Sequence, residues 1–172
     1  LPSPFADFWF PGIKRPFEDS FGAKVYLTGQ ESRGEITLRS ADPRDRPIIN
    51  YHSLSAPQDL AKLRQGVKMI REIAHSRYLD KYRGDPLFLS HPIESDAEID
   101  RFLHEQASQQ YHPACTCRMG DDERAVLDHD LAVRGVDGLN VVDGSAMPHL
   151  VSGNPNVVIM MMAAKAAASW AR

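Results

Sequence analysis

Features that would assign this chain to several common protein classes are scarce or missing. Two of its 172 residues are cysteines, and Cys115 and Cys117 stand one residue apart, a spacing that rarely allows a disulfide. A secreted scaffold held together by disulfides is therefore excluded. The Cys-x-Cys sequence also lacks the second pair of ligands that zinc sites show, so we expect no metal site.

Long apolar runs and dense basic runs are missing as well. The longest apolar stretch, Val157–Ala164, ends at Lys165, whereas a membrane-spanning helix needs about 20 apolar residues. We therefore expect no transmembrane segment. The net charge is −3, and the most basic stretch, Lys62–Arg71, is interleaved with apolar residues, so we expect no binding of nucleic acid.

The start of the sequence carries no targeting signal. It begins Leu-Pro-Ser-Pro, without an initiator Met, a basic leader or a cleavage site, and we expect the chain to be one piece of a larger protein. The content of 42% apolar and 25% charged residues is ordinary for one globular domain. The compartment is left open, between the cytoplasm and the periphery of a membrane.

Three helices are predicted from apolar periodicity and end signals. The first has Ser55 as a cap, Pro57 in its first turn and Asp59 at its positive end. Its buried stripe comprises Leu60, Leu63, Val67, Ile70 and Ala74.

Ser95 and Glu98 form a capping box for the second helix, whose apolar face is Ile99, Phe102 and Leu103. Pro155 opens the third helix, which is rich in Met and Ala and runs to about Ala171.

Short strands are predicted where apolar and polar residues alternate. Val25–Leu27 and Ile36–Leu38 should be two strands around a turn, and Ser40–Asn50, which contains Pro43 and Pro47, should be a loop. Leu139–Val142 should be a strand that ends at the turn Asp143-Gly144-Ser145. The stretches 78–92 and 110–130 show no regular period.

The residues with chemical potential lie in three segments toward the C-terminus. They read Tyr-His-Pro-Ala-Cys-Thr-Cys-Arg-Met-Gly (111–120), Val-Val-Asp-Gly-Ser-Ala-Met-Pro (141–148) and Gly-Asn-Pro-Asn (153–156). Taken alone, a loop histidine such as His112 is more often a structural hydrogen-bonding residue, and Asp143-Gly144 is a simple turn.

In this order and spacing, the three segments resemble the C-terminal signature of the glucose–methanol–choline (GMC) oxidoreductases. The stretches 32–43, 47–51 and 80–84 fit the same family, so the resemblance covers roughly residues 30–170. Within that family, the stretch 79–84 and the Cys-containing His-Pro segment resemble those of bacterial choline dehydrogenases and related alcohol dehydrogenases. Two departures stand out: Cys115 occupies a position where the family usually has Gly, and the dinucleotide fingerprint Gly-x-Gly-x-x-Gly is absent from the sequence.

The resemblance implies an α+β fold. An antiparallel substrate-domain sheet with flanking helices would be followed by the last strand and helix of an FAD-binding domain that is mostly missing. Residues 1–110 would form the substrate-binding part, and residues 111–172 the catalytic loop and the return to the FAD domain. The implied cofactor is FAD, and the implied partners are a small-molecule alcohol and the missing N-terminal FAD-binding region.

The resemblance also implies roles for individual residues. His112 falls on the catalytic position, where an imidazole with a pKa of about 6.5 suits a base that accepts a hydroxyl proton. Asn154 would orient the substrate oxygen and stabilise its charge, or it could cap the helix that follows. The cofactor-binding positions would be the ribityl and phosphate contacts Asp143 and Gly144 and the pyrimidine contacts at the backbone of Asn156 and Val157.

The leading hypothesis is the C-terminal part of an FAD-dependent alcohol dehydrogenase. It would oxidise a primary, choline-like alcohol to the aldehyde by hydride transfer to flavin, with His112 as the base. The alternatives are a flavoprotein lyase or decarboxylase of the same fold, and a truncated, non-catalytic piece. Since the dinucleotide fingerprint is missing, we expect the chain alone to be inactive and to bind FAD weakly. The sequence leaves open which alcohol is used and what reoxidises the flavin.

Overall fold

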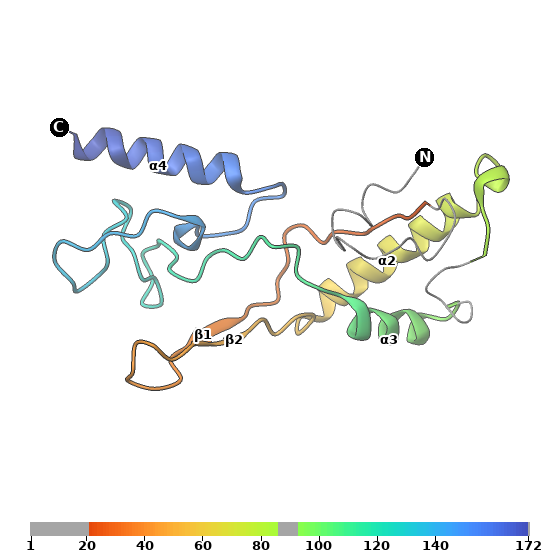
Figure 1. The fold of residues 1–172 in the computed structure, drawn as a ribbon, viewed down its shortest axis with the longest axis horizontal. Coiled ribbons are helices and arrows are strands. Elements are labelled where there is room, and N and C mark those ends of the chain that lie inside the picture. The colour runs from red at the N-terminus through yellow and green to blue at the C-terminus, as the bar shows by residue number, and fades with distance from the viewer. Residues whose placement is uncertain (1–20, 86–92, 172) are drawn as a thin grey trace. The chain divides into compact units, whose positions relative to one another are not determined.

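The computed structural model describes residues 21–85 and 93–171, which combine helices with one small sheet (Figure 1). The order of elements is β1 (Glu35–Thr37), β2 (Ile48–Asn50), α2 (Pro57–Ala74), the 3₁₀ turn η1 (Asp80–Tyr82), α3 (Asp96–Gln106), the 3₁₀ turn η2 (Gly144–Ala146) and α4 (Asn156–Trp170). This mixture confirms the predicted combination of helices and an antiparallel sheet. Within the described ranges, no helix is both long enough and apolar enough to cross a membrane.

The described residues pack as two compact units. The helical unit comprises residues 21–27, 60–85 and 93–106, and the C-terminal unit comprises residues 28–59 and 107–171. The boundary after Gln106 lies near the predicted division at residue 110, whereas the hairpin strands belong to the C-terminal unit. That residues 1–110 bind substrate and residues 111–172 carry the catalytic loop stays a prediction.

Helix α2 forms where its periodicity predicts it. Leu63 is buried on its inner stripe, and the other residues of that stripe are half-buried. Val25 packs against this helix at Gly66, where an added Cβ would lie 2.6 Å from Val25 Cγ1. The prediction of a strand at Val25–Leu27 is therefore wrong, since these residues have no ladder partner in the described part of the chain and Val25 packs on a helix instead.

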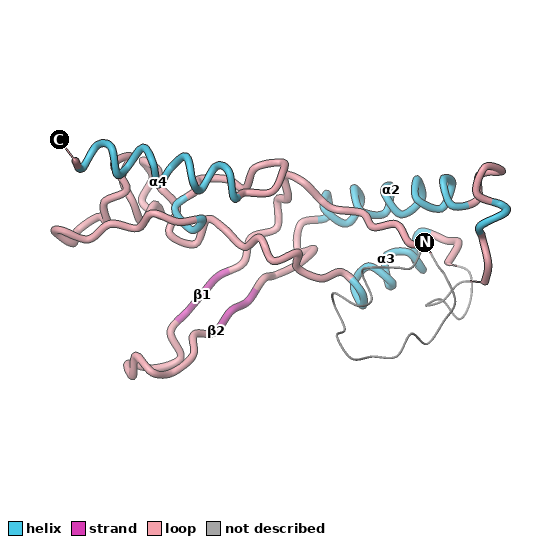
Figure 2. The backbone as a smooth tube through the Cα atoms, turned by 45° about the horizontal axis from the view of Figure 1, so that its top comes forward, coloured by secondary structure: helices cyan, strands magenta, loops and turns pink. Residues whose placement is uncertain are grey.

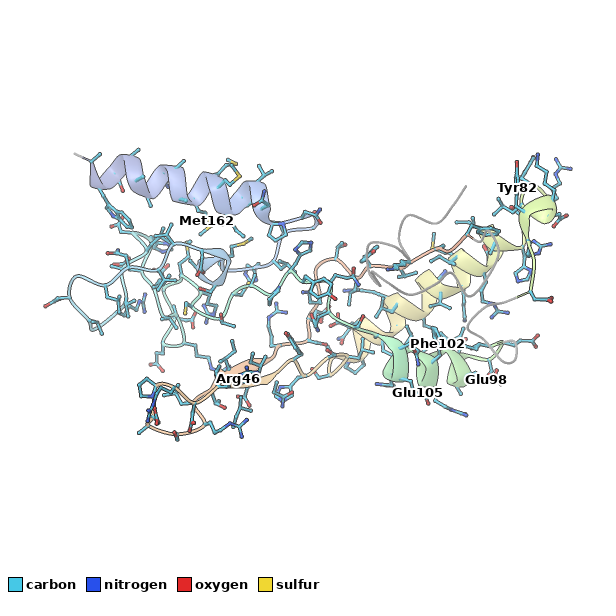
Figure 3. The ribbon with its side chains drawn as sticks, in the orientation of Figure 1. Arg46, Tyr82, Glu98, Phe102, Glu105 and Met162 are labelled. Atoms are coloured by element: carbon cyan, nitrogen blue, oxygen red, sulfur yellow. The ribbon has the colours of Figure 1, made fainter. Side chains whose placement is uncertain are left out.

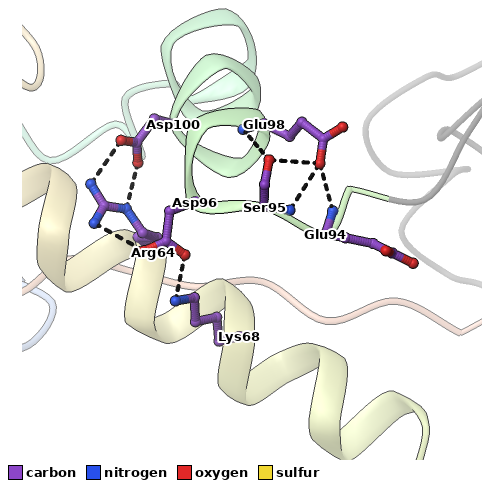
Figure 4. Close-up of polar contacts among 7 residues, drawn as sticks. All are labelled: Arg64, Lys68, Glu94, Ser95, Asp96, Glu98 and Asp100. Carbon is purple, nitrogen blue, oxygen red and sulfur yellow. Dashed lines mark hydrogen bonds and ion pairs between the residues drawn. The ribbon is translucent and has the colours of Figure 1, made fainter.

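Ion pairs join α2 to α3 within the helical unit (Figure 4). The Arg64 guanidinium donates to both carboxylate oxygens of Asp100, at 2.6 and 2.7 Å, and Lys68 Nζ lies 2.5 Å from Asp96 Oδ1. Lys68 lowers the pKa of the Asp96 carboxyl through this hydrogen bond. These contacts fix the register of the two helices with charges that stay near solvent.

The start of α3 confirms the predicted capping box. The Ser95 hydroxyl accepts from the Glu98 amide at 3.2 Å, and Glu98 Oε2 accepts from the Ser95 amide at 2.8 Å (Figure 4). Ile99 and Leu103 are buried on the predicted apolar face, and Phe102 is half-buried.

Strands β1 and β2 form an antiparallel hairpin in which Ile36 faces Ile49 (Figure 2). The strand predicted at Ile36–Leu38 is confirmed within one residue, but its partner lies inside the predicted loop Ser40–Asn50. Pro47 is compatible with the position just before a strand, and the β-branched Ile48 and Ile49 favour extended backbone. The loop is therefore shorter than predicted, and it ends at Pro47.

The core of the C-terminal unit lies between α4 and the loops that it covers (Figures 1 and 2). Leu127, Leu131, Ala146 and Ala166 are buried there, and the half-buried Met162 of α4 packs against them (Figure 3). The strand predicted at Leu139–Val142 is wrong: the segment makes a single bridge, from Asn140 to Ala132, because no described strand continues the ladder.

A buried carboxylate anchors the segment before β1. Asp59, in the first turn of α2, is fully buried. It accepts from the Glu31 amide at 3.0 and 3.1 Å, from the Ser32 amide at 2.8 Å, and from the Ser32 hydroxyl at 2.6 Å. Charge-assisted hydrogen bonds from backbone amides balance the desolvation of a buried carboxylate.

Candidate active site

His112 lies on an irregular segment that follows α3, and its side chain is exposed. Within the described residues, no hydrogen bond or ion pair of its ring is found. The backbone on both sides is unusual, because Tyr111 has a φ of 61° and Cys115 a φ of 72°. Both values lie in the left-handed region, which side chains other than Gly seldom adopt.

A ladder of backbone hydrogen bonds joins residues 111–120, called here the His112 segment, to the turn at Gly144. The Cys115 amide donates to the Gly144 carbonyl at 3.1 Å, the Cys117 amide to that of Ser145 at 2.9 Å, and the Met119 amide to that of Ala146 at 3.0 Å. Residues 115–119 therefore run alongside η2, although roughly thirty positions separate them in sequence. The structure thus brings together two of the three motif segments.

Asp143 and Gly144 have different tasks in this turn. The Asp143 carboxylate accepts from the Ser145 amide at 2.7 Å and from the Ser145 hydroxyl, and so it caps η2. These bonds agree with the interpretation of Asp143-Gly144, taken alone, as a simple turn. Gly144 lies against α4, where an added Cβ would be 3.1 Å from Ile159 Cδ1 and 3.9 Å from the Pro113 carbonyl oxygen. Gly144 is therefore the point at which the His112 segment, η2 and α4 approach one another.

The start of α4 contributes the third motif segment. Pro155 is buried and occupies the N-cap position, and no side chain of the described residues makes a cap hydrogen bond there. The capping role considered for Asn154 is therefore wrong, because the residue at the cap is a proline whose side chain cannot accept a bond. Asn154 is exposed, and its side chain makes no hydrogen bond within the described part of the chain.

The predicted pyrimidine contacts lie in the first turn of α4. Asn156 Nδ2 donates to the sulfur of Met160 at 3.7 Å, and Val157 is 65% exposed. Their backbone amides belong to the first turn, where α-helices lack internal acceptors for N–H groups. Of the predicted site residues, Gly144, Asn156 and Val157 thus adjoin one helix end. Among the described residues, no hydrogen bond links the His112 and Asn154 side chains.

The two cysteines of the His112 segment are free thiols, and both are half-buried. Burial raises the pKa of the Cys115 thiol, which outweighs the opposite effect of the Arg33 and Arg118 guanidiniums. Over residues 21–85 and 93–171, no cluster of three or more His, Cys, Asp or Glu side chains could hold a metal ion.

Sequence reasoning missed the left-handed conformations of Tyr111 and Cys115. For Cys115 a signal existed, since the resemblance expects Gly at that position and Gly tolerates a positive φ. In this chain the larger Cys115 adopts a positive φ as well. For Tyr111 the sequence offers no comparable signal.

The comparison with known proteins covers most of the chain. A family model described as GMC oxidoreductase matches residues 30–163. The oxygen-dependent choline dehydrogenase of Pseudomonas aeruginosa is 41% identical over 158 residues, which is 92% of this chain and 28% of that protein. The chain spans only between 26% and 28% of the length of such curated relatives.

Solved structures also match most of this chain. Pyridoxine 4-oxidase from Mesorbium loti superposes with a TM-score of 0.76 and 33% identity, over 83% of this chain and 28% of that one. A formate oxidase from Aspergillus oryzae gives a TM-score of 0.73 and 26% identity, over 78% of this chain and 24% of that one. The described fold thus recurs within much longer enzymes.

Proposed function

The chain belongs to the GMC oxidoreductase family, and on that basis we propose that it forms the C-terminal part of an FAD-dependent alcohol dehydrogenase. The proposed substrate is a primary alcohol of the choline type, which is oxidised to the aldehyde. The similarity to oxygen-dependent choline dehydrogenase supports this substrate class. The similarity to a formate oxidase studied for its FAD modification supports the cofactor.

The observation that carries the proposal is the ladder between the His112 segment and η2. Its first bond, from the Cys115 amide to the Gly144 carbonyl at 3.1 Å, ties the segment that carries His112 to a glycine that lies against Ile159 of α4. A helix start offers N–H donors and a partial positive charge. A base and an anion-stabilising element on adjacent segments suit the removal of a hydride and a proton from an alcohol.

The residues at the start of α4 fit a flavin. No side chain among the described residues caps the helix, so its first amides, including those of Asn156 and Val157, are available to an acidic ring edge. Gly144 packs directly against this helix, since an added Cβ would lie 3.1 Å from Ile159 Cδ1. When bound, FAD would supply the hydride acceptor. Contacts of the ribityl and phosphate region with Asp143 and Gly144 are part of the proposal.

In the proposed reaction, His112 accepts the proton of the substrate hydroxyl. Its exposed ring, which has no protein partner among the described residues, is available to a substrate. Pro113 restricts His112 to extended backbone conformations, which limits the directions of the ring. Imidazole takes up a proton near neutral pH without a large shift of its pKa.

Asn154 has the complementary role of orienting the substrate oxygen. Its amide can donate a hydrogen bond but cannot take a full proton at neutral pH. Because Pro155 occupies the cap of α4, the Asn154 amide is not used for capping. It can therefore stabilise negative charge on the oxygen as the proton leaves.

The proposed partner of this chain is an N-terminal FAD-binding region. Val157, Met160 and Met161 of α4 are each at least 63% exposed, and Ile36 and Ile49 of the hairpin are about half exposed. A two-stranded hairpin is marginally stable alone, and contiguous exposed apolar surface marks a binding face. A larger protein would cover both surfaces.

The test uses the full-length, FAD-loaded protein with a panel of primary alcohols that includes choline. His112→Ala should lower the rate of anaerobic flavin reduction by roughly 10²–10⁴-fold, while FAD content is kept. Asn154→Ala should lower it by about 10²–10³-fold. His104→Ala, which removes an exposed histidine of α3, is the matched control and should leave the rate unchanged.

Two results would contradict the proposal. A near-normal rate of flavin reduction in His112→Ala would show that His112 is not the base. Failure of every alcohol to bleach the flavin of the wild-type protein would point to a lyase or decarboxylase of the same fold.

A further inference from the structure

Cys115 is held in a backbone conformation that its side chain disfavours. Its φ of 72° is left-handed, and such a residue persists where the surrounding structure determines it. Residues of this kind concentrate at functional sites, where they fix a neighbouring group in place. Cys115 stands three positions after His112, the proposed base.

The contacts around Cys115 account for its conformation. Its amide donates to the Gly144 carbonyl at 3.1 Å, which is the first rung of the ladder to η2. The left-handed turn redirects the chain after Pro113, so that the Cys117 and Met119 amides can form the next two rungs. If Cys115 left this conformation, the segment that carries His112 would lose its first attachment to η2.

The side that precedes His112 is also constrained. Tyr111 has a φ of 61°, and Pro113 limits the backbone of His112 itself. The short stretch from Tyr111 to Cys115 thus contains two left-handed residues and one proline around the histidine. The backbone of His112 is thus restricted from both sides, and this restricts the direction of its Cα–Cβ bond.

We propose that Cys115 is a positioning residue for His112, and that it acts through its left-handed backbone and its amide bond to Gly144. The inference rests on the proposed function, in which His112 is the base. The thiol itself has no chemical part in it. Burial raises the pKa of the Cys115 thiol, so the sulfur is protonated at neutral pH and is a poor nucleophile.

Substitutions at Cys115 separate the backbone from the thiol. Cys115→Gly favours the left-handed conformation, and Cys115→Ala removes the thiol but keeps a Cβ. Cys115→Val introduces a β-branched residue, for which a positive φ is a severe outlier. Cys117→Val is the matched control, because Cys117 is a half-buried cysteine of the same segment whose φ is not positive.

The measurements are made on the full-length, FAD-loaded protein. Cys115→Val should lower the maximal rate of flavin reduction by about 10²-fold, the loss expected from a small misplacement of a catalytic group, with less effect on KM. The Gly and Ala variants and the Cys117→Val control should stay near the wild-type rate. Hydrogen exchange should show faster exchange of the amides at positions 115 and 117 in Cys115→Val, and not in Cys115→Gly.

The outcomes separate this proposal from the proposed function. Normal turnover and normal amide protection in Cys115→Val would overturn it, and so would an equal loss of rate in Cys115→Ala, which would assign the effect to the thiol. If Cys115→Val does not fold, slower flavin reduction in Cys115→Gly than in wild type would overturn it. An unimpaired His112→Ala protein with Cys115 intact would instead refute the proposed function.

Discussion

The buried carboxylate of Asp59 should be a large contributor to the stability of the C-terminal unit. It is fully buried and accepts from two backbone amides and one hydroxyl, at distances from 2.6 to 3.1 Å. Hydrogen bonds to a charged group contribute about 1.5–3 kcal/mol each, and an unsatisfied buried donor costs about 1–3 kcal/mol. These values are not additive, so we expect Asp59→Ala to lower the free energy of unfolding by about 3–5 kcal/mol.

Asp59→Asn removes the negative charge of the carboxylate but keeps the size of the side chain. The amide keeps one acceptor oxygen but places an NH₂ group against a backbone N–H, so we expect a loss of about 2–3 kcal/mol. Asp137→Asn is the control, since Asp137 is exposed, and it should change stability by less than about 0.5 kcal/mol.

The assay is urea unfolding of the three variants and the wild type, followed by circular dichroism. Hydrogen exchange of the Glu31 and Ser32 amides gives a local reading, because both donate to Asp59. A loss below about 1 kcal/mol in Asp59→Ala, within the range of ordinary surface substitutions, would refute the reasoning. Unchanged protection of both amides would refute it as well.

The other predictions concern the cofactor and pH. The 172-residue chain alone should bind FAD weakly or not at all, because it lacks a dinucleotide fingerprint; tight stoichiometric binding in a fluorescence titration would contradict this. The pKa of the Asp122 carboxyl is lowered chiefly by its hydrogen bond with Arg118, and that of Asp96 by Lys68. Each pair therefore stabilises the fold fully above the unfolded-state pKa of about 4, and its contribution is lost as the pH falls through the lower folded-state value. Urea midpoints measured from pH 6 to pH 2 should fall only in the acidic part of this range. In the double variant Arg118→Gln/Lys68→Gln, this fall should be smaller than in the wild type.

The helices could be predicted from sequence because their signals are local. The stripe of α2, the capping box of Ser95 and Glu98, and Pro155 before α4 each determine structure within a few residues. Among the strands, only β1 could be predicted, from its own alternation of apolar and polar residues. Its partner could not, because strand pairing is non-local. Ile48–Asn50 is hidden in a polar stretch with prolines, and only the presence of β1 makes it a strand.

The candidate site shows the same division. The proposed roles of His112, Asn154 and Gly144 come from the resemblance of three sequence motifs to those of the GMC oxidoreductases. Their arrangement depends on the left-handed turn at Cys115 and on hydrogen bonds to a segment much later in the chain, which no local pattern encodes. Pro155 could be recognised in the sequence as the start of α4, but the sequence did not show that Pro155 occupies the cap and leaves Asn154 without a capping role.

The position of α4 has a consequence for biosynthesis. Helix α4 follows every other described element, so a ribosome completes the His112 segment and η2 before it completes the helix. Until then Leu127 and Leu131 lack Ala166 and Met162, which close their side of the core. The core of the nascent segment therefore depends on a helix that is made after it, and a translation product that stops before Asn156 would present an open core to chaperones and proteases.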